Sequence, residues 1–312
     1  MKKLLLTLFI TLCTLGISMA QDLEKATELY NTAATTLNEG NTAAALDQFQ
    51  QALKMAETLG EEGTEIVSQC KGIIPKLYYA IGKDYAAAKD LDNAIATLKK
   101  AVEVAKEYGD TETLTDAQDL MPQILMADAG SLLNEKKFAE AAAAYKKVIA
   151  VDPENGMAFL RMGMALAANN DTDAAVEALT TAMSKGQEDN AKKQLSNIFL
   201  KKAVACQRAK DAKGALEAAQ KSVEYVDNAN GQKIIGLSAI TLKQNKVAAE
   251  ALEAYLAMQP EAKDKVQITY QLGTALMGAG LNDKACGYFK QIVSDPKWGE
   301  AAKYQVTTLK CN

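Results

Sequence analysis

A pair of small residues, twelve positions apart, recurs seven times along this chain and constrains its fold more than any other feature. The pairs are Ala33 with Ala45, Gly82 with Ala94, Ala129 with Ala141, Gly163 with Ala175, Ala203 with Ala215, Gly236 with Ala248, and Gly273 with Ala285. Small residues that face each other let two antiparallel helices approach closely, whereas a larger side chain would overpack the contact. The repetition therefore predicts a row of helix pairs, each of which buries its apolar face against its neighbours.

The residues around each pair keep the periodicity of an α-helix. In the segment 136–153, Phe138, Ala141, Tyr145 and Val148 are three or four residues apart and therefore share one helical face. Pro153 is expected to end this helix, because proline has no N–H to donate and crowds the residue before it. One helix of this kind cannot hide its apolar face alone, so we interpret the segment as one part of an array.

The composition supports an all-α chain and narrows the chemistry. Only 5 of the 312 residues are Pro, and 48% are hydrophobic, which is ample for a large core. The chain has no His, so it lacks the most common general base and metal ligand. Sequence motifs of serine hydrolases, P-loops, zinc proteases, EF-hands and CxxC sites are missing too. We therefore predict no enzyme activity, no catalytic residue, no metal site and no cofactor.

The N-terminus reads as a bacterial signal peptide. Lys2 and Lys3 precede the apolar run 4–17, and the small residues Ser18 and Ala20 flank a cleavage site that follows Ala20. The apolar run is short for a membrane span, and no other long uncharged apolar run occurs. We predict export to the periplasm or cell envelope without membrane insertion.

The charges argue against a broad nucleic-acid or lipid surface. The chain has 35 basic and 39 acidic residues, and such a mildly acidic protein is not suited to cover polyanions. One basic stretch stands out, with Lys192, Lys193, Lys201, Lys202, Arg208, Lys210 and Lys213. We interpret it as a solvated helix face, with an acidic partner as the alternative, because aromatic residues do not interleave the charges as single-stranded nucleic acid requires.

The pattern resembles the tetratricopeptide repeat. That repeat has a step near 34 residues, a small residue twelve before an Ala, a large residue four after that Ala, and a Pro at the end. The resemblance covers essentially the whole mature chain, is strongest in residues 122–187, and is weakest where Ala219 replaces the usual large residue. It implies an all-α, right-handed α-solenoid of about seven helix pairs with a C-terminal capping helix.

We predict four regions on this basis. They are a signal peptide (1–20), N-terminal helix pairs with long helices (21–121), C-terminal helix pairs (122–297), and the capping helix with its tail (298–312). Pro75 and Pro122 are expected to begin or kink helices, and Pro153, Pro260 and Pro296 to follow helix ends.

The resemblance also implies where a partner would bind. In tetratricopeptide proteins the first helices of the pairs line a concave groove for peptides or helices. The matching residues here are Tyr30, Tyr79, Lys83, Met126, Met157, Leu160, Met164, Leu200, Val204, Leu237 and Tyr270. The alternative is that several of them simply pack between repeats. Some family members grip a C-terminal carboxylate with paired basic residues and Asn. We do not expect that here, because Lys83 and Lys233 are isolated in different helix pairs.

Four cysteines lie beyond the signal peptide, and none has metal-ligand spacing. Cys286 lies near the start of one helix and Cys311 at the end of the capping helix, so a hairpin would bring them to the same end. They are a candidate disulfide, with two free thiols as the alternative. Cys206 is expected to be a buried free thiol, and Cys70 is left open.

Together these features predict a non-catalytic scaffold that binds a partner protein or peptide in the cell envelope. Two other functions are kept as alternatives: an enzyme-associated module that binds glycan or another small molecule, and a self-assembling structural scaffold. The sequence names neither the partner nor the oligomeric state.

Overall fold

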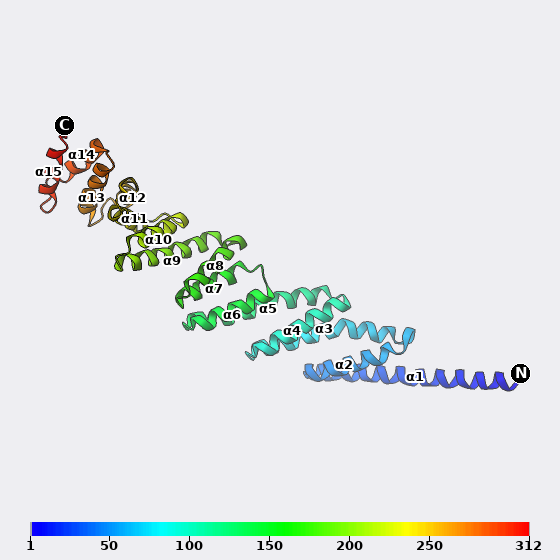
Figure 1. Cartoon of the computed structure of the whole chain (residues 1–312). Helices are drawn as coiled ribbons and strands as arrows, with labels where there is room; N and C mark the ends of the chain where they lie inside the picture. The colour runs from blue at the N-terminus through cyan, green and yellow to red at the C-terminus, as the bar shows by residue number, and fades with distance from the viewer. Residues whose placement is uncertain (1, 312) are drawn as a thin grey trace. The chain divides into compact units, whose positions relative to one another are not determined.

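A computed structural model describes residues 2–311 of the chain, with side chains from residue 20 onward. The described residues form helices joined by short connections, without β-strands (Figure 1). We call the first helix of each pair its A helix. The A helices are α1 (Lys2–Asn38), α3 (Thr64–Ala87), α5 (Thr111–Asn134), α7 (Gly156–Ala168), α9 (Glu188–Arg208), α11 (Ala229–Thr241) and α13 (Lys265–Gly278). We call the second helix of each pair its B helix. The B helices are α2 (Thr42–Glu57), α4 (Leu91–Tyr108), α6 (Phe138–Val151), α8 (Thr172–Ala182), α10 (Ala212–Tyr225), α12 (Asn245–Met258) and α14 (Asn282–Gln291). The final helix is α15 (Gly299–Thr308), and the short segments η1 (Gly60–Gly63) and η2 (Met183–Gln187) adjoin α2 and α8.

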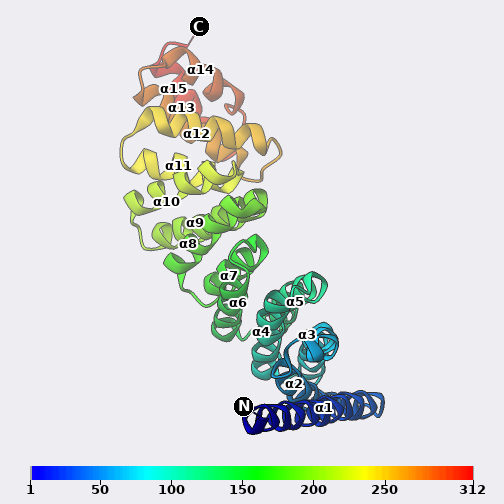
Figure 2. The ribbon, with the colours of Figure 1, turned by 90° about the vertical axis from the view of Figure 1, so that its right-hand side faces the viewer.

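This element order confirms the predicted all-α solenoid of seven helix pairs and one further helix. The chain forms two compact units. Unit 1 holds the residues up to 135 and 144–153, and unit 2 holds 136–143 and the residues from 154 onward. Within each unit, consecutive helices pack side by side, as α9 to α13 show in Figure 2. The predicted boundary between residues 121 and 122 stays a prediction.

The turns between A and B helices share one backbone conformation. Each contains one residue with positive φ: Gly40, Lys89, Lys136, Asn170, Lys210, Lys243 or Gly280. The next residue donates its N–H five positions back, as Asp90 does to the carbonyl of Tyr85 at 2.9 Å, which satisfies a carbonyl at the end of the A helix. The Asp90 side chain then caps α4 by accepting a bond from the Asn93 N–H. The repeated turn sets the antiparallel course of each helix pair.

The glycines of the A-helix pattern lie where the two helices of a pair meet, as predicted. In four pairs a Cβ on the glycine would clash with a side chain of the B helix: at 2.7 Å for Gly82 and Leu98, 2.6 Å for Gly163 and Leu179, 2.3 Å for Gly236 and Leu252, and 2.6 Å for Gly273 and Phe289. The nearest group is thus the large residue sixteen positions on, and not the paired alanine. The recurrent glycine makes room for the large side chain that fills the core of its pair.

The prolines behave in two ways. Helix α6 ends at Val151, two residues before Pro153, as expected. Pro75 and Pro122, which were expected to begin or kink helices, lie inside α3 and α5 and therefore do not begin them. A kink at either position stays a prediction. Proline in a helix removes one backbone hydrogen bond. Both helices continue because the residues around each proline are buried in the core of unit 1: Ile74 and Leu77 in α3, Met121 and Leu125 in α5.

The N-terminal prediction remains open. Residues 1–19, which hold the apolar run of the predicted signal peptide, lie outside the part of the chain whose side chains are described. Among the described residues, none of the helices combines the length and apolar character that crossing a membrane requires.

Candidate functional site

Three of the four predicted groove residues of unit 1 are half-buried, and the fourth, Lys83, is exposed. Tyr30 is half-buried and packs edge-on against Phe49, with ring centroids 5.3 Å apart. Tyr79 is half-buried too, and the Lys83 amine lies 5.4 Å from the centre of its ring. Met126 is half-buried in α5. The two tyrosines therefore pack within their own helices and pairs.

Four predicted groove residues of unit 2 differ among themselves. Leu160 is only 5% exposed and belongs to a core that includes Leu179, so it cannot present surface to a partner. Tyr270 packs against other aromatic rings and is half-buried. Met157 is half-buried, whereas Met164 is 36% exposed. Leu160 and Tyr270 therefore pack between helices, which was the alternative considered for these positions.

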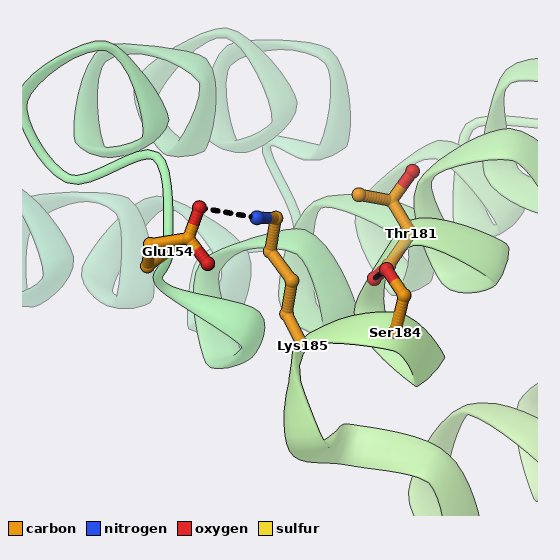
Figure 3. Close-up of polar contacts among 4 residues, drawn as sticks. All are labelled: Glu154, Thr181, Ser184 and Lys185. Atoms are coloured by element: carbon orange, nitrogen blue, oxygen red, sulfur yellow. Dashed lines mark hydrogen bonds and ion pairs between the residues drawn. The ribbon is translucent and has the colours of Figure 1, made fainter.

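The start of α7 is fixed by structural contacts at the end of α8. Gly156 has no room for a side chain, since a Cβ would lie 2.1 Å from the carbonyl oxygen of Lys185. Figure 3 shows the Lys185 amine beside the Glu154 carboxylate, with Nζ and Oε1 2.6 Å apart. Ser184 donates to the Thr181 carbonyl at 2.8 Å, which holds the end of this turn. The cluster positions α7 and the methionines on it.

Leu200, Val204 and Leu237 lie where α9 packs against α11, and we call this region the α9–α11 seam. It has a hollow at each end of α9. The N-end hollow, of about 580 Å³, is lined by Lys193, Ser196, Asn197, Leu200, Val226, Asn228, Ala229, Asn230, Tyr255 and Gln259. The C-end hollow, of about 350 Å³, is lined by Gln207, Lys210, Ala212, Ala215, Leu237, Ser238 and Thr241. Each lining contains one lysine and no carboxylate.

A hydrogen-bond network forms the floor of the N-end hollow. Ser222 Oγ donates to the Ser196 carbonyl at 2.9 Å. Asn228 Nδ2 donates to Ser222 Oγ at 3.2 Å and to the Val226 carbonyl at 2.9 Å. Asn228 Oδ1 accepts from the Gly231 N–H at 2.7 Å and so caps α11. Because these buried polar groups satisfy one another, the floor is rigid before any partner arrives.

A second polar cluster lies at the edge of this hollow. Tyr255 donates to Asp264 Oδ1 at 2.7 Å, and Lys233 forms an ion pair with the same carboxylate. Burial, the hydrogen bond and the charge of Asp264 raise the pKa of Tyr255 to about 12. Burial alone would raise the pKa of Asp264, but hydrogen bonds from Lys233 and Tyr255 outweigh it and hold that pKa below its usual value. Lys233 is therefore already engaged and is not free to grip a C-terminal carboxylate.

A larger hollow, which the sequence did not indicate, follows α1 in unit 1 and is called the α1 groove. Its volume is about 1080 Å³, and its lining is Ala20, Leu23, Glu24, Thr27, Glu28, Asn31, Thr32, Thr35, Thr36, Glu39 and Glu62. The threonine hydroxyls bond back to the helix, as Thr27 does to the Leu23 carbonyl at 2.8 Å. Four glutamates and no basic residue line it, so its charge is opposite to that of the α9–α11 seam.

The cysteines and acidic residues do not form a reactive centre. Cys286 and Cys311 form a disulfide, with Cα atoms 5.5 Å apart, that ties α14 to the residues after α15. Cys70 is a free, buried thiol whose pKa burial raises to about 11, and Cys206 is free but only half-buried. No group of three or more Cys, Asp or Glu side chains suited to a metal ion occurs among the described residues.

Sequence comparison identifies the repeats. Residues 75–108 and residues 132–196 match the sequence profile of the tetratricopeptide repeat. These two segments of the chain therefore contain tetratricopeptide repeats. Proteins with such repeats are generally non-catalytic interaction modules that bind protein or peptide partners, so the repeats support a protein-interaction scaffold. No curated protein sequence matches the chain.

Several solved structures are similar to this chain. A crystal structure of MamA is 24% identical, with a TM-score of 0.37, and the match covers 59% of this chain and 94% of that one. YrrB, described as a tetratricopeptide protein with an unusual peptide-binding site, is 17% identical with a TM-score of 0.34, covering 58% and 91%. A thermophilic tetratricopeptide protein of Thermus thermophilus, TTC0263, is 14% identical with a TM-score of 0.27, covering 61% and 98%.

Proposed function

We propose that this protein is a non-catalytic scaffold that holds a partner protein on the A helices of unit 2, at the α9–α11 seam. The observation that carries the proposal is the pair of hollows along the seam, which combine apolar Leu200 and Leu237 with polar side chains. A bacterial signal peptide cleaved after Ala20 would deliver the protein to the periplasm or cell envelope, where the partner would be found.

The seam is suited to a polypeptide. Asn197 and Asn230 line the N-end hollow and are exposed, and an amide side chain can both donate to and accept from a peptide backbone. The hollow has room for a few side chains, and Leu200 offers them an apolar contact. Because the network around Asn228 holds the floor in place, binding would cost little ordering of the protein itself.

Two residues with raised pKa values are not activated as catalytic nucleophiles or bases. Cys70 and Tyr255, whose pKa values are about 11 and about 12, remain protonated near neutral pH. A catalytic nucleophile or base needs a pKa near or below the working pH. Neither residue therefore has the properties of a reacting group.

The test is capture of partners from cell-envelope extract by the mature protein, with crosslinking and mass spectrometry. Asn197→Trp would fill the N-end hollow from an exposed helical position, and we expect it to abolish capture of the partner that crosslinks to unit 2. Gln220→Trp on α10 is the matched control, since Gln220 is also exposed and lies outside both hollows. Equal capture by both variants would contradict the proposed surface.

The same material separates the two other functions. A glycan or small-molecule module would show a thermal shift with cell-wall fragments that Asn197→Trp removes, in the absence of any protein partner. For a self-assembling scaffold, the mass measured by light scattering would increase with protein concentration. For the proposed scaffold, we expect that mass to stay constant.

A further inference from the structure

We infer that the α9–α11 seam binds an acidic, extended polypeptide segment, whose carboxylates meet Lys193 at one end and Lys210 at the other. The inference rests on the proposed function and names the class of partner. Lys193 and Lys210 are seventeen residues apart along α9 and its following turn, or roughly 25 Å at the rise of a helix. An extended segment of about eight residues spans that length.

The charge of the A helices in unit 2 is one-sided. Helices α7, α11 and α13 contain no Asp or Glu, and α9 contains only Glu188 and Asp189 in its first turn. The same four helices contain Arg161, Lys192, Lys193, Lys201, Lys202, Arg208, Lys233 and Lys265. This excess runs against a formal net charge of −4 for the whole chain, so it is a local property of this surface.

Some of these cations are already paired. Lys192 bonds to Glu188 with Nζ and Oε1 2.6 Å apart, and Lys233 is paired with Asp264. Lys193, Lys201 and Arg208 are exposed and make no ion pair within the described part of the chain. These side chains are therefore available to an incoming carboxylate without breaking an existing contact.

Two of these three available cations lie along the seam. Lys193, Asn197, Leu200, Val204 and Arg208 are spaced by three or four residues, so they form one stripe on α9. Both Leu200 and Val204 pack against the core shared with α11, which places the stripe beside that helix. An acidic segment lying along it would alternate carboxylates with apolar side chains.

Three carboxylates near the seam lie outside both hollows and make contacts of their own. Asp264 is held by Lys233 and Tyr255, and Asp227 accepts a bond from Gln232 at 2.7 Å. Asp211, next to Lys210, caps α10 by accepting from the Gly214 N–H at 2.9 Å. Each of the three is engaged inside unit 2, and both hollows are free of carboxylates.

The surface fits an acidic polypeptide better than a nucleic acid. Nucleic-acid surfaces of this size interleave charges with exposed aromatic rings on which bases stack. The aromatic residue in the two linings is Tyr255, which is 6% exposed. The apolar residues at the seam are Leu200, Val204 and Leu237, which suit aliphatic side chains.

The test is fluorescence anisotropy of a labelled decapeptide that alternates Glu and Leu, titrated with the mature protein. We expect saturable binding that weakens as salt rises, and none with the same peptide carrying Gln or Lys in place of Glu. An amidated C-terminus should not change the affinity, because side-chain carboxylates are recognised. Binding that depends on the free C-terminus would overturn the inference.

Two charge-removing variants carry the second part of the test. Lys193→Gln and Lys210→Gly together should weaken binding of the Glu-containing peptide about tenfold, as expected for the loss of two exposed charge contacts. Lys210 has a φ of 58°, so glycine suits its backbone. The matched controls are Lys284→Gln on exposed α14 and Lys243→Gly, whose φ is also 58°. The control pair should bind like the parent, with equal unfolding temperatures confirming that all variants fold.

The outcomes separate this inference from the proposed function. If the Glu peptide does not bind up to millimolar concentration while envelope capture still depends on Asn197, the scaffold stands and the acidic specificity is wrong. If a thymidylate oligonucleotide binds as tightly and competes with the peptide, the seam recognises polyanions generally and the inference is overturned. If both capture and peptide binding fail, the seam is not a binding surface.

Discussion

The A helices of the two units share one framework but differ in charge, although α3 in unit 1 carries both basic and acidic residues. In unit 1, α5 contains Glu112, Asp116, Asp119 and Asp128 and no basic residue, and four glutamates line the α1 groove. In unit 2, the A helices beyond the first turn of α9 carry only basic charges. Yet Gly82 in unit 1 and Gly236 in unit 2 make the same contact with a leucine of the B helix.

The comparison shows which parts of a repeat are constrained. The contact inside each helix pair needs a small residue opposite a large one, because a well-packed core does not tolerate added volume. The outer surface of the A helix has no such demand, so its charge can differ between units. Partner recognition in such a scaffold therefore depends on surface residues that packing does not determine.

Among the predicted changes, removal of the disulfide in unit 2 should have the largest effect on stability. Cys311→Ser should lower the free energy of unfolding of unit 2 by about 3 kcal/mol, because the bridge closes a loop with a sequence separation of 25. Thiol labelling with mass spectrometry in rising urea follows each unit, with Cys206 reporting on unit 2 and Cys70 on unit 1.

Unit 1 is the internal control of that experiment. Burial raises the pKa of the Cys70 thiol to about 11, so at pH 8 it should stay unreactive until unit 1 unfolds. Its labelling midpoint should be the same with and without Cys311. A shift of both midpoints together would show that the two units unfold as one.

The second-largest effect is expected for substitutions at the contact inside a helix pair. It tests whether this contact is equivalent in the two units. Gly82→Ala and Gly236→Ala should each cost about 1–3 kcal/mol, because the new Cβ would lie 2.7 Å and 2.3 Å from a leucine side chain. Gly72→Ala is the control, since nothing lies within 4 Å of its Cβ position in α3. It should stabilise by about 0.5–1 kcal/mol through helix propensity. Urea denaturation measures all three, and a neutral Gly236→Ala would contradict the packing account.

A smaller effect concerns Asp264, which has no counterpart among the contacts described for unit 1. Its folded pKa is lowered, so its stabilising contribution is present above the usual carboxyl pKa and is lost as pH falls through the folded value. Unit 2 should therefore lose stability below about pH 4 through this group. Asp264→Asn should flatten that part of the profile in thermal melts between pH 5 and pH 2.5. An unchanged profile would show that the pairing with Lys233 does not stabilise the fold.

The smallest effect concerns the shared turn. Lys89 in unit 1 and Lys243 in unit 2 have φ values of 61° and 58°, a conformation that costs a residue with a Cβ about 1 kcal/mol. Lys89→Gly and Lys243→Gly should each be neutral or stabilising by less than about 1 kcal/mol, because glycine also loses more freedom on folding. Melting temperatures that fall for one variant only would show that the two turns are not equivalent.

Much of the fold could be predicted from the sequence, because the signals are local. The end of α6 before Pro153, the span of α15, and the small residue of each A helix all follow from periodicity and from residue chemistry. The positions of Pro75 and Pro122 could not be predicted in this way. Their tolerance inside α3 and α5 depends on core contacts made by the residues around them.

The candidate site was less predictable. Leu200, Val204 and Leu237 were predicted to line a partner groove and lie where α9 packs against α11, whereas Leu160, predicted for the same groove, is buried. The position of a residue in the repeat predicts only approximately which face of the helix its side chain occupies. Small rotations of neighbouring helices then decide whether a side chain is covered.

By itself, the sequence determined the helix pairs, their turns and the close contact within each pair, because these depend on residues at most sixteen positions apart. The tertiary structure decided which charges remain available. Lys233 and Asp264 are 31 residues apart and neutralise each other, while Lys193 stays free at the mouth of a hollow formed by α9, α11 and α12. Such pairings depend on how distant segments pack, and helical periodicity carries no information about that.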